Sequence, residues 1–178
     1  MKYLITTIVA VLLVGCGPSV SIHEAAYDGN IEVVKEWLKS NKVDLGEDEN
    51  GWTVLDNALY SKNEELIKLI KESGGASNVN KSLFIAAGVG DLDAVKKHVA
   101  AGADINEKDA DGWSPIFYAS DQKHVAEYLI SKEAELNIVD NDGWTPLDSA
   151  FDSNDRAVID LIRKHGGKTG EELKAAGN

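Results

Sequence analysis

The sequence predicts an all-α protein, a solenoid of about five helix-turn-helix units that are connected by short β-hairpin fingers. The main observation is an internal repeat, because one segment of similar sequence recurs five times. Its first aliphatic positions, separated by 33, 28, 33 and 31 residues, are Ile22, Leu55, Leu83, Ile116 and Leu147. A single unit of this length cannot bury its apolar face, but five stacked units share one continuous core.

Each unit contains signals for two helices. The first helix carries small residues, such as Ala25-Ala26 and Ala86-Ala87, which let neighbouring units approach closely. The second helix is amphipathic, since apolar residues recur at helical spacing in 65–70 and in 157–162. Glycines such as Gly74-Gly75 follow the second helix and supply the left-handed residue that ends it.

Three junctions between units contain a tight-turn signal. Asn50-Gly51, Asp111-Gly112 and Asp142-Gly143 are each followed by tryptophan, and Asp/Asn-Gly is the chemistry of a hairpin turn. We therefore expect fingers at about 43–53, 104–114 and 135–145. The junction between Gly75 and Leu83 is five residues shorter, so no finger is expected there. Trp52 should then be separated from any aromatic row that Trp113 and Trp144 form.

The repeat resembles the ankyrin repeat. The segment Trp144-Thr145-Pro146-Leu147-Asp148 is similar to the Thr-Pro-Leu-His core of that family, and the likeness runs from Ile22 to about Lys168. The resemblance implies units near 22–50, 51–79, 80–111, 112–142 and 143–168. The family histidine remains only at His23, and its replacement elsewhere, by Asp56 and Asp148 among others, is expected to weaken local capping hydrogen bonds. Residues 169–178 are expected to form a C-terminal capping segment, because Thr169 and Glu172 have capping-box spacing.

The N-terminus has the order of a signal peptide. Lys2 precedes an apolar run over 4–14, which is too short to span a membrane. The segment Leu13-Val14-Gly15-Cys16 resembles the bacterial lipoprotein lipobox, and a plain signal peptide is the alternative. The resemblance implies that 1–15 is removed, that Cys16 is lipidated, and that 16–21 is a very short anchored N-terminus. The protein would then be exported and anchored to a bacterial membrane, with Gly17 favouring the periplasmic face of the outer membrane.

Composition and motifs exclude several functions. With 18 basic and 30 acidic residues the net charge is −12, which disfavours binding to nucleic acid. A single cysteine allows no disulfide framework and no cysteine zinc site. The four histidines match no catalytic motif, and the Asp-rich turns fail the calcium-loop pattern. We expect no enzymatic activity, no cofactor and no metal.

The resemblance implies binding of another protein through the finger tips and the concave face. The acidic surface would suit a basic partner, and the chain is expected to be a monomer. The alternative role for the tryptophans is to brace their own fingers, and we expect binding to depend on Trp113 and Trp144 more than on Trp52. The candidate partner-binding residues are Trp52, Trp113, Trp144, Asp111, Asp142, Tyr60, Asp121 and Asp152.

The sequence thus favours a lipid-anchored protein–protein interaction module of the bacterial cell envelope. The alternative is an inhibitor or immunity protein that neutralises a basic toxin or enzyme.

Overall fold

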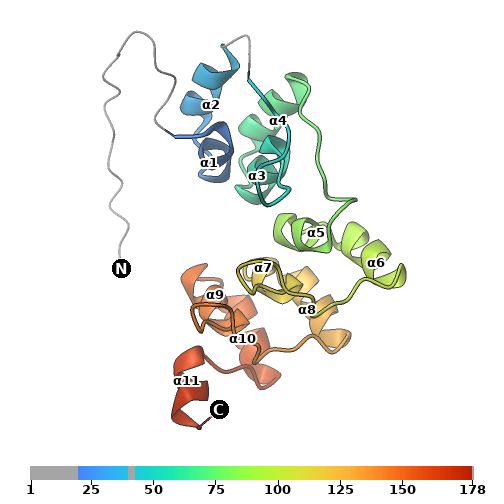
Figure 1. Ribbon diagram of the computed structural model, residues 1–178, viewed down its shortest axis with the longest axis vertical. Helices are drawn as coiled ribbons and strands as arrows, with labels where there is room; N and C mark the ends of the chain where they lie inside the picture. Colours follow the sequence, from blue (N-terminus) through green and yellow to red (C-terminus); the bar gives the residue numbers. More distant parts are fainter. Residues whose placement is uncertain (1–19, 40–42, 178) are drawn as a thin grey trace.

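Five helix pairs and one terminal helix make up the described part of the chain, residues 20–39 and 43–177 of the computed structural model (Figure 1). The expected signal peptide over 1–15 and the lipidation site Cys16 lie outside the described residues. The helices are α1 Ile22–Tyr27, α2 Ile31–Leu38, α3 Val54–Tyr60, α4 Glu64–Glu72, α5 Leu83–Val89, α6 Leu92–Ala100, α7 Pro115–Tyr118, α8 Lys123–Ser131, α9 Pro146–Asp152, α10 Arg156–Lys164 and α11 Gly170–Ala175. The predicted all-α stack is confirmed.

The pairs stack along a curved axis, as Figure 1 shows. The odd-numbered inner helices from α1 to α9 pack one on the next along the concave side, and the even-numbered outer helices cover the convex side. Most helices begin at a polar side chain that accepts a backbone N–H, for example Thr53 for α3 and Asn63 for α4. None of the helices in the described ranges is long and apolar enough to cross a membrane.

The buried core has two parts. One cluster joins the first two units around Val54, Leu66 and Ile70. The second cluster joins units three to five and includes the fully buried Phe117 and Leu147. The division falls between α4 and α5, which is the junction without the finger.

Three tight turns project at the predicted places, and we call them finger 2 (43–53), finger 4 (104–114) and finger 5 (135–145) after the unit that each one opens. In finger 2 the backbone N–H of Asp48 donates to the carbonyl of Trp52 at 2.8 Å, and fingers 4 and 5 repeat this bond. The fingers are turns rather than paired strands, since the only β-bridge within the described residues joins Glu47 to Thr53. Between Gly75 and Leu83 the chain makes only a small turn, in which Lys81 N–H bonds to the carbonyl of Asn78 at 2.7 Å.

The expectation of weakened caps is wrong at Asp56 and Asp148. The buried Asp56 carboxylate accepts the backbone N–H and the hydroxyl of Thr53 at 3.0 and 2.8 Å, and it also accepts the N–H of Asn78 in the next junction. Asp148 repeats this pattern with Thr145 and with the N–H of Gly170 at 2.7 Å. Each aspartate therefore caps the N-terminus of its own helix and also accepts a hydrogen bond from the segment that follows the unit.

The C-terminal cap has the predicted form. Helix α11 begins with a capping box between Thr169 and Glu172, and Leu173 is buried. The Arg163 side chain of α10 pairs with Glu172 and fastens the cap to the stack.

Candidate functional site

One aspartate shapes each finger in the same way. Asp48, Asp109 and Asp140 each use the oxygen Oδ1 to accept two backbone N–H groups of their own turn, one of them from the tryptophan. The group that donates to the second oxygen, Oδ2, differs from finger to finger. In Asp140 it accepts the indole N–H of Trp113 at 3.0 Å, and in Asp109 it accepts the hydroxyl of Tyr118 at 2.6 Å. No hydrogen bond from any described residue reaches Oδ2 of Asp48.

The three finger tryptophans differ in exposure. Trp52 is 7% exposed, Trp113 is half-buried, and Trp144 is 45% exposed. The indole of Trp113 links finger 4 to finger 5 through Asp140, so it ties its finger to the next one, whereas the alternative role had each tryptophan bracing its own finger. The three rings are therefore not equivalent, although their local sequences are nearly the same.

The expectation that Trp52 stands apart from the other rings is wrong. Its ring stacks on Tyr118 with centroids 5.8 Å apart, and Tyr118 meets Trp113 edge-on at 5.4 Å. On its other side Trp52 meets Tyr60 at 6.0 Å, and Tyr60 stacks on Tyr27 at 5.0 Å. A continuous aromatic row thus runs from unit 1 to unit 4.

The absence of a finger between units 2 and 3 allows this row. The Trp52 ring lies over α5, where a Cβ on Gly88 would come within 2.6 Å of the ring. A residue without a side chain is therefore required there while the ring keeps its place. Tyr118, from the first helix of unit 4, then reaches the ring across α5.

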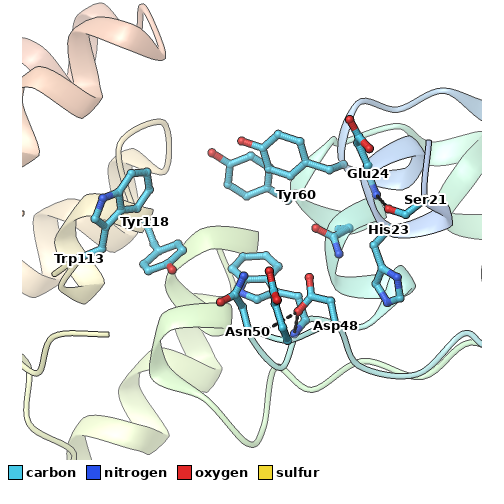
Figure 2. A pocket seen from close by; sticks show the side chains of 12 residues that line it. Ser21, His23, Glu24, Asp48, Asn50, Tyr60, Trp113 and Tyr118 are labelled. Carbon is cyan, nitrogen blue, oxygen red and sulfur yellow. Dashed lines mark hydrogen bonds between the residues drawn. The ribbon is translucent and has the colours of Figure 1, made fainter. Parts of the chain in front are cut away.

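A groove opens beside the row, with a volume of about 560 Å³. Figure 2 shows Trp113 and Tyr118 at one end of it and His23 and Glu24 at the other. Between these ends Tyr60 faces Asp48 and Asn50. Its charged lining consists of Glu24, Asp48 and Glu49, without a lysine or arginine among the described residues that line it. The groove is therefore aromatic and acidic.

Tyr60 and Tyr118 of the groove stay protonated at neutral pH. Burial raises the pKa of Tyr118 above its usual range, and the hydrogen bond to Asp109 adds to the effect. Burial also raises the pKa of Tyr60, with smaller contributions from Tyr27, Asp121 and Asp152. The groove walls thus present neutral phenol rings.

The predicted binding residues divide into separate places. Trp52, Tyr60 and Trp113 line the groove. Trp144, Asp142 and Asp152 line a second hollow of about 540 Å³ near α11, which also contains Lys174.

The two remaining candidates have structural contacts. Asp121 pairs with Lys62 at 2.9 Å and ties unit 4 to unit 2. Asp111 is exposed at the tip of finger 4, where its carbonyl accepts the N–H of Asn141 at 3.0 Å.

Sequence reasoning did not assign Tyr118 or Asp48 to the site. Tyr118 follows Phe117 in an inner helix and carries no motif of its own. Asp48 could have been found, because Asp48, Asp109 and Asp140 stand at the same position before each Gly-Trp pair.

The histidines do not form a reactive cluster. His23 and His98 bond through Nε2 to the carbonyls of Gly46 and Val79, at 2.9 and 3.1 Å. His124 and His165 are exposed on outer helices and their ends. Across 20–39 and 43–177, no three His, Cys, Asp or Glu side chains are placed to hold a metal ion.

Comparison with known families finds two matches, both to ankyrin repeats. One family model, for ankyrin repeats in three copies, matches residues 83–171, which is half of the chain. A second, for ankyrin repeats in many copies, matches residues 22–70. The matched ranges coincide with the helix pairs, and ankyrin repeat domains are typically interaction modules without enzymatic activity.

Two curated relatives are similar over part of their length. An L-asparaginase of Dirofilaria immitis is 29% identical over 121 residues, which are 64% of this chain and 20% of the relative. A protein described as VAPYRIN-LIKE from Medicago truncatula is 32% identical over 83 residues, which are 47% of this chain and 16% of the relative. The chain spans a fifth or less of either relative, so the similarity transfers neither relative's role.

Proposed function

Because this chain belongs to the ankyrin repeat family, we propose that it is a lipid-anchored protein–protein interaction module of the bacterial cell envelope, binding a basic partner through its concave face. The observation that carries the proposal is the aromatic, acidic groove beside Trp52, Tyr60 and Trp113. Aromatic side chains that a partner covers on binding are typical of the residues that dominate binding energy. The net charge of −12 would attract a basic partner and speed its association.

The lipid anchor rests on the lipobox resemblance at Leu13-Val14-Gly15-Cys16. Lipidation of Cys16 would place the groove near the membrane, since Ser21 lines the groove and lies only five residues further along the chain. An extended chain of that length reaches about 17 Å. The proposed location is the periplasmic face of the outer membrane, and the proposed form is a monomer.

The anchor can be tested by expressing the full chain and the Cys16→Ser variant in a bacterium. We expect the wild-type protein in the membrane fraction, with a mass that includes acyl chains, and the variant outside that fraction. An unmodified mass, or equal membrane association of both forms, would contradict the anchor.

Partner binding can be tested with the detergent-solubilised, lipidated protein as bait. We expect a basic protein to be retained at low salt and released as the salt concentration rises, because screening weakens charge attraction. Retention of acidic proteins only, or retention that salt does not change, would contradict the proposed partner class.

An inhibitor or immunity role is a second candidate, favoured by the same acidic groove. The two roles differ in what happens to the partner. If the retained protein is a toxin or enzyme and loses its activity when bound, the inhibitor role holds. If its activity is unchanged, the chain is an anchor or scaffold.

A further inference from the structure

The carboxylates of the three fingers suggest what the groove binds. In fingers 4 and 5 the second carboxylate oxygen is used by an aromatic side chain, from Tyr118 or Trp113. In finger 2 the same oxygen belongs to Asp48, which lines the groove, and no described residue donates to it. A carboxylate oxygen beside aromatic faces is a site for a cationic donor.

Two lysines of units 2 and 3, among the described residues, are paired with carboxylates outside the groove. Lys62 is held by Asp121 at 2.9 Å, and Lys81 is held by Glu47 at 3.1 Å. The groove lining contributes Glu24, Asp48 and Glu49 without a matching positive charge. A positive charge supplied by a partner would complement this lining.

The groove walls are already fixed in place. The Tyr27–Tyr60 stack has an interplanar angle of 12°, and Trp52 is wedged between Tyr60 and Tyr118. Rings that are held by their neighbours lose little conformational freedom when a ligand binds. The site is thus organised before the ligand arrives.

We propose that this groove binds an arginine side chain from an extended segment of the partner protein, with its guanidinium against the aromatic walls and hydrogen-bonded to Asp48. The inference rests on the proposed function and names the group that the concave face recognises. Arginine fits better than lysine because its planar group stacks on rings and is more weakly hydrated than an ammonium, while one of its N–H groups can donate to Oδ2 of Asp48. A volume of about 560 Å³ leaves room for the flanking backbone.

The test uses the full chain, labelled with ¹⁵N in a neutral detergent, and short capped peptides. The peptides have arginine, lysine or the neutral isostere citrulline between glycines. We expect the arginine peptide to shift the indole N–H signals of Trp52 and Trp113 and to leave that of Trp144 in place. We expect lysine to bind about fivefold more weakly, and citrulline to cause no shift.

Matched variants test the named residues. Asp48→Asn keeps an oxygen for the turn and removes the charge, so we expect binding of the arginine peptide to fall about tenfold. Asp44→Asn is the control, because Asp44 makes the same kind of turn bond, to Gly46 N–H at 2.8 Å, but does not line the groove. Tyr60→Leu should also weaken binding, and Tyr128→Leu on the convex side should not.

Several results would overturn the proposal. These are equal binding of the citrulline peptide, an unchanged affinity in Asp48→Asn, and tighter binding of free argininamide than of the peptide, which would indicate a small-molecule site. The outcome is separable from the proposed function. If the full chain retains a basic protein with an affinity that Asp48→Asn and Tyr60→Leu do not change, the groove inference fails while the proposed function stands.

Discussion

The two N-terminal units and the three C-terminal units follow one sequence pattern but treat their fingers differently. Fingers 4 and 5 bind each other, through the Asn141 side chain on the carbonyl of Ala110 at 2.8 Å and through Trp113 on Asp140. Finger 2 has no finger beside it on that side, and Trp52 turns onto α5 instead. Where the neighbouring finger is missing, the tryptophan becomes a core residue and Oδ2 of its aspartate has no donor among the described residues.

The largest effect that this comparison predicts is on Trp52. Trp52→Ala should lower the free energy of unfolding by about 3–5 kcal/mol, because it removes a buried ring from between two others. Trp113→Ala should cost about 2 kcal/mol, since its ring is half-buried and holds Asp140. Trp144→Ala should cost less than about 1 kcal/mol, because 45% of the residue is exposed. Urea denaturation followed by circular dichroism measures all three.

The expected ranking is that Trp52→Ala costs most, Trp113→Ala costs less and Trp144→Ala costs least. Equal costs would mean that the three fingers are equivalent after all. Trp37→Ala serves as a reference, because Trp37 lies in the outer helix α2 and donates its indole N–H to the carbonyl of Val20 at 3.0 Å, not to a finger.

The next effect concerns the aspartates that replace the family histidine. Asp56→Ala should cost about 3 kcal/mol, since it leaves buried donors on Thr53 and Asn78 without acceptors. Asp148→Ala should cost about half as much, because Asp148 is less deeply buried. Asp104→Ala, an exposed aspartate in a turn, is the charge-matched control and should cost below about 0.5 kcal/mol. A larger loss of unfolding free energy for Asp148→Ala than for Asp56→Ala would contradict this ranking.

Most of the fold could be predicted from the sequence, because it depends on periodic features. The repeat spacing of 28 to 33 residues, the Gly-Trp turns and the short junction at 75–83 determine the helix pairs and the finger positions. The role of Asp56 could not be predicted in this way. Its carboxylate accepts the backbone N–H of Asn78, which lies 22 residues further along the chain, and no local sequence pattern signals such a bond.

A smaller effect is expected at Gly88, which lies under the Trp52 ring. Gly88→Ala should destabilise the protein by about 1–2 kcal/mol, because the new methyl group would meet a ring that cannot move away. In a Trp52→Leu background the same change should be neutral or stabilising, since alanine favours the helix by about 1 kcal/mol. A double-mutant cycle measures this coupling. If Gly88→Ala costs the same in both backgrounds, the ring is not held against α5.

The candidate site was predicted only in part, for a related reason. The aromatic residues after each finger glycine were visible in the sequence, and two of them do line the groove. The groove itself depends on Tyr118 reaching across α5 to Trp52, a contact between units 4 and 2 that skips a unit. Aligning the repeats compares every unit with one common pattern. It therefore does not reveal the contact of Tyr118 with Trp52, which forms because the junction between units 2 and 3 is short.

The smallest effect concerns the cap that closes the C-terminal half. The pKa of Glu172 is lowered from 4.5 to about 2, first by the hydrogen bond from Arg163 and then by the backbone N–H of Thr169. Because the folded-state pKa lies below the ordinary value, this contribution is fully present above about pH 4.5 and is lost as the pH falls toward 2. Glu172→Gln should therefore lower the melting temperature slightly at pH 7 and not at pH 2. Glu171→Gln, at the neighbouring exposed position, should change neither value. A difference between wild type and Glu172→Gln that stays constant from pH 7 to pH 2 would mean that the charge of Glu172 does not hold α11 on the stack.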